Sequence, residues 1–324
     1  MDFRYTEDQQ DLIDAAKAVF DGENTPERMR ALVSQEKGSE EVADLWPQFA
    51  ELGLLGLMAP ESAGGLEQNL AVMAGVAEAA GYAGLPEGFV EMAGISIPCL
   101  IEATIDGELL SDVINGTKRV AVQSDIRPYI HAAGKMDYFL CADDCTARAD
   151  SEVTPVKSID PLRDIARVSP TGIGSDLAKN NGAVLSAAQL VGLSKRMIDM
   201  SVEYAKDRHQ FGKPIGSFQA IKHHLATAYT QIEFTRPMVH LAALQGGRAV
   251  HTAKIAAIDM AMLAGETAIQ VHGGMGYTFE VDLHLFMKRA WALCGEWGDR
   301  NYHMKQLENL VLGGNTPLGA GTTF

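Results

Sequence analysis

The C-terminal half of the chain repeats apolar residues at the spacing of long helices. One such run covers residues 184–202, and a second covers residues 218–232. Extended in both directions, the pattern predicts four long helical segments, over residues 183–207, 217–246, 249–271 and 282–310. Four such helices favour an antiparallel bundle, in which Ser217 caps the second helix and Pro237 kinks or splits it.

The N-terminal part also has a helical pattern, but its segments are shorter. Thr6 and Gln9 form a candidate capping pair for the first helix, and Asp44 can cap a helix over residues 46–52. Glycines and Pro60 then predict a helix end and a turn, and an alanine-rich helix is expected over residues 69–81. We therefore predict an all-helical domain for this part of the chain.

Residues 117 to about 170 follow a different pattern. Two stretches, KRVAVQSDI from Lys118 and DYFLCADD from Asp137, alternate apolar and polar residues as β-strands do. Prolines at positions 128, 155, 161 and 170 are expected to exclude further strands. We predict a mainly α-helical fold with a small β insert, divided into an N-terminal helical domain (1–116), a reduced β-domain (117–170) and a C-terminal four-helix bundle (171–324).

Composition narrows the class of protein. The 324 residues can bury a sizeable core, and the net charge of -15 excludes nucleic acid as the expected partner. No apolar run is long enough to span a membrane, and the polar N-terminus does not match a signal peptide. The chain has four cysteines, and their spacing matches neither a zinc site nor a CxxC redox motif: Cys99, Cys141, Cys145 and Cys294. We therefore expect reduced thiols, no metal site and a cytoplasmic protein.

The break between the first two predicted long helices has the composition of an anion site. It reads YAKDRHQFGKPIGSFQ, from Tyr204 to Gln219. Gly212 can take a positive φ and Pro214 fixes the return, so Arg208 lies on a short rigid corner near the start of the next helix. A guanidinium at such a place suits a phosphate or pyrophosphate. The simpler interpretation is that Arg208 only caps a helix.

A second stretch, QVHGGMGY, follows the third predicted helix. That helix ends at His272, and Gly273 and Gly274 leave main-chain N–H groups uncovered, so a flat ligand can approach the backbone. The stretch is not a Rossmann fingerprint, because a helix precedes it where a strand is required. The simpler interpretation is a glycine that ends a helix.

Three motifs in the chain resemble signatures of the acyl-CoA dehydrogenase family. DRHQFGKPIGSFQ, from Asp207, resembles the family string R-x-x-F-G-x-P-I-x-x-F-Q ahead of a long bundle helix. QVHGGMGYTFE, from Gln270, resembles the second signature, and DLWPQFAELGLLGLMAPESAGG, from Asp44, resembles the third. The motifs occur in the family's order and cover both ends of the chain.

The resemblance implies a cofactor and a way of binding it. Family members hold FAD and oxidise acyl-CoA thioesters, and the adenosine-pyrophosphate half of each FAD also meets the neighbouring subunit. Carried over position by position, the resemblance implies contacts to FAD from Arg208, Gln210, Phe211, Gln219, Gln270, His272, Gly273 and Gly274. His209, His223 and His224 do not match ligand spacing and are interpreted as surface or bundle residues.

The chain departs from the family pattern at two places that matter for catalysis. The middle region is too short for the T-E-P-x-A-G-S-D type loop that cradles the flavin ring, and Gln123-Ser124-Asp125 is no more than a remnant of it. At the usual position of the glutamate base this chain has Trp297, while Glu296 is one place early and would point about 100° away on a helix. A second family position for the base falls near Gly182. We therefore assign no catalytic residue.

Three hypotheses remain open. In the first, the chain is the small, non-catalytic subunit of a heterotetrameric (α2β2) acyl-CoA dehydrogenase, similar to those of bacterial steroid side-chain degradation. Its partners would be a homologous catalytic subunit, an acyl-CoA and an electron-transfer flavoprotein as electron acceptor. In the second, the chain is a self-sufficient enzyme whose base is Glu296 or Asp299. In the third, it is a non-enzymatic α-bundle protein that binds no flavin.

Overall fold

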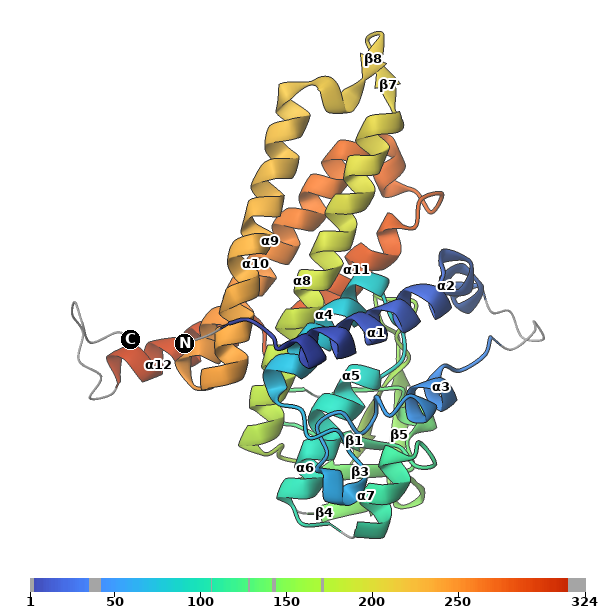
Figure 1. Cartoon of the computed structure of the whole chain (residues 1–324), viewed down its shortest axis with the longest axis vertical. Helices are drawn as coiled ribbons and strands as arrows, with labels where there is room; N and C mark the ends of the chain where they lie inside the picture. The colour runs from blue at the N-terminus through green and yellow to red at the C-terminus, as the bar shows by residue number, and fades with distance from the viewer. Residues whose placement is uncertain are drawn as a thin grey trace.

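The computed structural model describes residues 3–34, 42–105, 107–127, 129–141, 144–169 and 172–313. Figure 1 shows an upright helical bundle, with the N-terminal helices and small sheets gathered around its lower part. The bundle contains α8 (Asp176–Asp207), α9 (Gln219–Gln245), α10 (Arg248–His272) and α11 (Leu283–Cys294), and α12 (Arg300–Leu312) leaves it sideways. The predicted mainly helical fold with a small β region is confirmed.

The fourth predicted helical segment is wrong as a single helix. It is interrupted after Cys294 and resumes at Arg300, where Asp299 caps α12 by accepting a hydrogen bond from the backbone N–H of Tyr302 at 2.7 Å. Trp297 and Gly298 have φ values of 55° and 99°, which no helix accommodates. The apolar periodicity continued across this break because residues on both sides are buried.

Two predictions about the start and middle of α9 also need correction. Ser217 belongs to a short 3₁₀ turn, η5 (Ile215–Ser217), and the residue at the N-cap is Phe218, whose side chain makes no capping hydrogen bond. Pro237 lies inside α9, and the helix runs through it without being split. Tertiary packing of a long helix thus outweighs the one backbone hydrogen bond that proline removes.

The N-terminal helical region has the predicted cap of its first helix and more segments than predicted, but the N-cap of α3 is Leu45, without a side-chain cap, where Asp44 was expected. Its helices are α1 (Glu7–Glu23), α2 (Pro26–Val33), α3 (Trp46–Glu51), α4 (Leu70–Ala83), α5 (Phe89–Glu91), α6 (Ile97–Glu102) and α7 (Gly107–Ile114), with η1 (Glu61–Ala63) before α4 and η2 (Met92–Ser96) after α5. Thr6 and Gln9 form the reciprocal capping box of α1. Asp44 accepts a hydrogen bond from the backbone N–H of Trp46 at 3.2 Å.

The middle region forms two three-stranded sheets. The first orders β1 (Val120–Val122), β3 (Tyr138–Cys141) and β4 (Asp144–Ala147), and the second orders β2 (Ile130–His131), β6 (Ile165–Ser169) and β5 (Glu152–Val156). The two predicted strands are confirmed as β1 and β3, which pair in parallel. The prediction that prolines exclude further strands is wrong: Pro155 lies in β5, an edge strand, where a missing N–H costs no ladder bond.

Helix α8 connects the two regions that matter for function. It packs along α4 so closely that a Cβ on Gly192 would lie 1.9 Å from the backbone oxygen of Glu78. Gly182 is near one end of α8 and Tyr204 near the other, roughly 33 Å apart at about 1.5 Å per residue. Each end of α8 therefore belongs to a different candidate site. The predicted domain boundaries remain predictions.

Candidate functional site

The first candidate site is the hairpin at the upper end of the bundle, which Figure 1 shows beyond the ends of α8 and α9. The chain leaves α8 at Arg208 and forms β7 (His209–Gln210) and β8 (Lys213–Pro214), which pair antiparallel. Phe211 and Gly212 make the turn with φ values of 53° and 78°, as a two-residue type I′ hairpin requires. The predicted corner is therefore a tight hairpin.

The second motif lies against the first. Helix α10 ends at His272, Gly273 takes a φ of 59°, and η6 (Gly273–Tyr277) follows. The imidazole of His272 stacks on the ring of Tyr204 with centroids 4.4 Å apart, one turn before Arg208. His272 donates from Nδ1 to the backbone oxygen of Ala268 at 2.8 Å, and burial lowers the pKa of the imidazole. Two motifs that are far apart in the sequence thus meet at one end of the bundle.

Most of the residues predicted to contact FAD are open to solvent. The exposed ones are Arg208, Gln210, Phe211, Gln219, Gln270, Gly273 and Gly274, whereas His272 is buried. Phe211 is 91% exposed, and its ring makes an edge-on contact with the ring of Phe218. His209, His223 and His224 are exposed, as expected for surface residues. Among the described residues, Phe211 is thus an uncovered large aromatic next to the exposed Gly212 of the same turn.

The hairpin end also carries cations that the sequence motifs did not single out. Within the residues that the structure describes, the side chains of Arg208 and Lys222 make no hydrogen bond or ion pair, and Lys213 lies over the ring of Phe218 at 4.4 Å. In a chain with a net charge of -15, these three exposed cations near one hairpin are free to bind an anion. Lys213 and Lys222 were missed because single lysines carry no sequence signature.

The second candidate site is at the other end of α8, where the two family positions for the base meet. A Cβ on Gly182 would lie 2.1 Å from Cδ2 of Trp297, so the indole occupies the space that a side chain at position 182 would need. Trp297 is only 2% exposed. Its φ of 55° is strained for a bulky residue and costs about 1–3 kcal/mol. The structure therefore brings together two residues, neither of which can accept a proton.

Glu296 is held in a buried ion-pair cluster. Arg163 donates to its Oε1 at 2.7 Å, and the Nε of Arg127 donates to its Oε2. Burial acts to raise the pKa of Glu296, but the charges and hydrogen bonds of Arg127 and Arg163 outweigh it and lower the pKa to about 2. Arg127 also forms an ion pair of 3.7 Å with Glu91. Both carboxylate oxygens of Glu296 are therefore engaged, and the group stays ionised.

The loop that carries Glu296 and Trp297 is fixed from the bundle side as well. His303 donates from Nε2 to the backbone oxygen of Trp297 at 3.0 Å. Burial lowers the pKa of His303 to about 4, so its Nδ1 accepts a hydrogen bond from the Nδ1 of His251 at 2.8 Å. Arg127 and Arg163 thus hold Glu296, and His303 of α12, which is itself held by His251 of α10, holds the backbone of Trp297.

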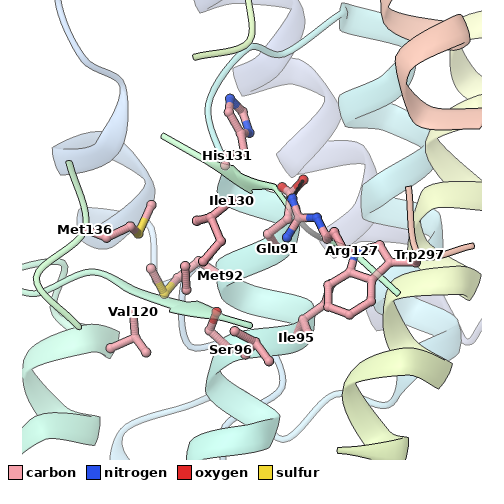
Figure 2. A pocket seen from close by; sticks show the side chains of 13 residues that line it. Glu91, Met92, Ile95, Ser96, Val120, Arg127, Ile130, His131, Met136 and Trp297 are labelled. Atoms are coloured by element: carbon pink, nitrogen blue, oxygen red, sulfur yellow. Dashed lines mark ion pairs between the residues drawn. The ribbon is translucent and has the colours of Figure 1, made fainter. Parts of the chain in front are cut away.

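Figure 2 shows the small pocket beside Trp297. The pocket is lined by Gly88, Glu91, Met92, Ile95, Ser96, Val120, Ala121, Val122, Arg127, Ile130, His131, Met136 and Trp297. The guanidinium of Arg127 lies 5.1 Å from the centre of the Trp297 indole. The remaining cavity volume is about 10 Å³, enough for no more than about one water molecule. No acyl group fits in this space as it stands.

The segment considered as a remnant of the flavin loop is covered. A Cβ on Gly174 would lie 2.9 Å from the backbone oxygen of Gln123, and one on Gly172 would lie 3.0 Å from Oε1 of the same residue. Ser124 is buried, and Asp125 pairs with Lys179 of α8 at 2.9 Å. The strand end that would face a flavin ring is therefore packed under residues 172–174.

Two other kinds of site were sought across the described ranges. Among those residues, no three His, Cys, Asp or Glu side chains are placed to hold a metal ion. In the same part of the chain, every helix is too short or too polar to cross a membrane. The two ends of α8 therefore remain the candidate sites.

Comparison with known proteins gives consistent results. Residues 6–103 match the N-terminal domain of acyl-CoA dehydrogenases, and residues 178–309 match their C-terminal domain. Acyl-CoA dehydrogenase IpdE2 of Mycobacterium tuberculosis is 31% identical over 293 residues, which cover 88% of this chain and 91% of the relative.

Solved structures share the fold over nearly the whole chain. A chain of the ChsE4-ChsE5 complex from Mycobacterium tuberculosis has a TM-score of 0.86 at 23% identity, covering 98% of this chain and 100% of that one. The steroid ACAD Tcur3481-Tcur3483 has a TM-score of 0.83 at 22% identity, with coverages of 96% and 99%. PigA with FAD and proline has a TM-score of 0.82 at 18% identity, with coverages of 97% and 100%.

Proposed function

The chain belongs to the acyl-CoA dehydrogenase family, and from that premise we propose that it is the non-catalytic partner subunit of an FAD-dependent member. In this proposal it supplies the adenosine-pyrophosphate half of the FAD site to a homologous catalytic subunit. The observation that carries the proposal is the contrast between the two ends of α8. The nucleotide end is open and cationic, whereas the end with the base positions is filled and closed.

The residues at the hairpin end fit a pyrophosphate group. Arg208, Lys213 and Lys222 offer exposed positive charge. The expectation of an uncovered N–H at Gly273 is wrong, because that group donates to the carbonyl of Ile269; what Gly273 and Gly274 offer is open space beside a backbone without side chains. Phe211 offers a flat apolar surface, and Gln210, Gln219 and Gln270 offer amide groups for polar atoms of the nucleotide. Bound FAD would supply the acceptor for the hydride taken from the acyl group.

The base end supports a non-catalytic role. Trp297 and Gly182 occupy the two positions at which the family places its base. Glu296, the nearest carboxylate, is a poor base because its pKa is about 2 and both of its oxygens accept hydrogen bonds from arginines. Asp299 already caps α12. These contacts count against the self-sufficient enzyme, because either residue would have to give up a structural role.

The comparisons favour a partner of the same fold and a bulky acyl group. Two of the solved structures with this fold are described as complexes or pairs of chains, and one of them as a steroid ACAD. We therefore propose an α2β2 assembly that dehydrogenates an acyl-CoA with a steroid-like group, with an electron-transfer flavoprotein as the electron acceptor.

Purification of the chain alone and with a full-length homologue from a neighbouring gene tests this function. The expected result is a colourless chain alone and a yellow complex that oxidises acyl-CoA and absorbs near ~450 nm, as flavin-dependent enzymes do. A chain that alone retains stoichiometric FAD and oxidises acyl-CoA would overturn the proposal. A colourless complex would instead favour the non-enzymatic bundle protein.

A further inference from the structure

The pocket of Figure 2 is closed by one side chain. The indole of Trp297 lies on the wall beside Ile95 and Arg127, while its other side fills the space above Gly182. The volume that remains, about 10 Å³, is too small for any ligand larger than a water molecule. Most of the remaining wall is apolar, from Met92, Ile95, Val120, Val122, Ile130 and Met136.

We propose that Trp297 is a plug in a latent ligand pocket. Without the indole, the space above Gly182 joins the small pocket and forms a binding site for a flat, uncharged, mainly apolar molecule. This inference deepens the proposed function and rests on it, because it identifies this pocket as the acyl site, which is closed in this chain. The geometry of the plug itself is independent of how the hairpin end is used.

The surroundings are rigid enough to keep the space open. Gly182 belongs to α8, which is packed along α4 and α10 and cannot move inward as a short loop would. The loop backbone is held at Glu296 by Arg127 and Arg163, and at the carbonyl of Trp297 by His303. None of these hydrogen bonds uses an indole atom; Arg127 also lies over the ring, so Arg163 and His303 are the contacts that do not depend on the indole. Cavities with such walls relax only partly.

The chemistry of the walls selects the ligand. The guanidinium of Arg127 faces the indole at 5.1 Å from the ring centre, an arrangement that favours an aromatic ring. Glu296 and Glu91 balance the charges of Arg127 and Arg163, so the cluster offers no net charge to an anion. The latent site therefore takes a neutral planar molecule, and indole is the probe that matches the missing group.

Thermal unfolding of the full chain with Trp297→Gly tests the plug. We expect a fall in Tm of roughly 10 °C, because a large buried side chain is lost. Indole should then raise the Tm of the variant by several degrees, because a ligand that binds only the folded state stabilises it. This rise should level off at high indole concentration. The Tm of the wild-type protein should not change with indole. The double variant G182A/W297G should show a smaller rise in Tm than W297G, because the added methyl group enters the same space.

A crystal structure of the indole-treated variant supplies the second readout. Indole above Gly182 and beside Arg127 would support the proposal. A folded W297G protein whose Tm does not respond to indole, or whose loop has collapsed onto Gly182, would overturn it. If W297G does not fold, W297A with benzene as the probe applies the same two criteria, because alanine is not β-branched and tolerates the positive φ at this position better than valine. The FAD content of the complex tests the proposed function separately, because it depends on the hairpin end.

Discussion

The ring of Tyr204 stacks on the ring of His272, with centroids 4.4 Å apart and an angle of 24° between the planes. The first residue lies one turn before the hairpin of Arg208, and the second lies directly before Gly273 and Gly274. The stack therefore fixes the two motifs proposed to bind FAD relative to each other. A single cofactor half can contact both motifs only if this spacing is kept.

Replacement of Tyr204 should weaken FAD binding by the complex without unfolding the chain. An aromatic pair contributes about 0.5–1.5 kcal/mol, so we expect Y204A to raise the FAD dissociation constant by up to ~10-fold. Y204F keeps the ring and should behave like wild type, because only the stacking is used here. Fluorescence titration of the apo-complex with FAD gives the FAD dissociation constant of each of the two variants. Equal affinities for Y204A and wild type would show that the stack does not position the site.

Arg208 should contribute more than the stack. We expect R208A to weaken FAD binding by ~10- to 100-fold, because a hydrogen bond to a charged group contributes about 1.5–3 kcal/mol. Arg300→Ala is the matched control: Arg300, at the start of α12, is also exposed, but it pairs with Asp259 of α10 at 2.7 Å. Calorimetric titration of the two complexes with FAD compares them. An R208A complex with unchanged affinity, or an R300A complex that is equally impaired, would contradict the assignment of the hairpin.

Glu296 should matter for stability and not for turnover. In E296Q the charges of Arg127 and Arg163 lose their buried counter-charge, so the free energy of unfolding should fall by about 3–5 kcal/mol at neutral pH. The turnover of the complex, measured at a temperature at which the variant is folded, should be unchanged. Loss of turnover by ~10²–10⁴-fold in a folded E296Q complex would instead identify Glu296 as the base.

The stability contributed by Glu296 should depend on pH in a defined direction. Its pKa in the folded chain is about 2, against an ordinary value of 4.5, so the unfolded chain binds the proton first as the pH falls. The contribution is fully present above pH 4.5 and is lost as the pH falls towards 2. Chemical denaturation of wild type and E296Q at pH 7 and pH 3 should show the difference between them shrinking. A constant difference would exclude this ion pair as its source.

Two helix glycines should respond in opposite ways to the same substitution. G182A should lower the free energy of unfolding by about 1–3 kcal/mol, because the new methyl group collides with the indole of Trp297. G265A should raise it by about 0.5–1 kcal/mol, because the nearest atom, in Met287, is 4.0 Å from the new Cβ and alanine favours a helix. Urea denaturation gives both values. A stabilised G182A would mean that Trp297 does not lie on Gly182.

The sequence predicted the elements whose signals are local. The long helices followed from apolar periodicity, and the capping box of Thr6 and Gln9 followed from residue identities three positions apart. Six of the eight strands in the described residues, β2 and β4 to β8, were missed, and Pro155 on an edge strand was interpreted as a break. In such strands the pairing partner decides the structure, and single-sequence patterns do not contain it.

The candidate sites were predictable to different degrees. The motifs at the hairpin end could be found because each is contiguous, whereas Arg127 and Arg163, the partners of Glu296, are more than a hundred residues away from it along the chain. The expectation that Glu296 points about 100° from position 297 assumed a helix, and the structure has a strained loop there. Burial of Lys254, which donates to Ser186 at 2.7 Å and whose pKa burial lowers to about 8, also carried no sequence signal.

The most direct test of the shared FAD site is a structure of the complex between this chain and its catalytic partner with FAD bound. The account predicts the pyrophosphate of FAD against Arg208, Gly273 and Gly274 of this chain, with the isoalloxazine ring inside the partner. An isoalloxazine ring found beside Trp297, or a hairpin end that faces solvent away from every subunit contact, would contradict it.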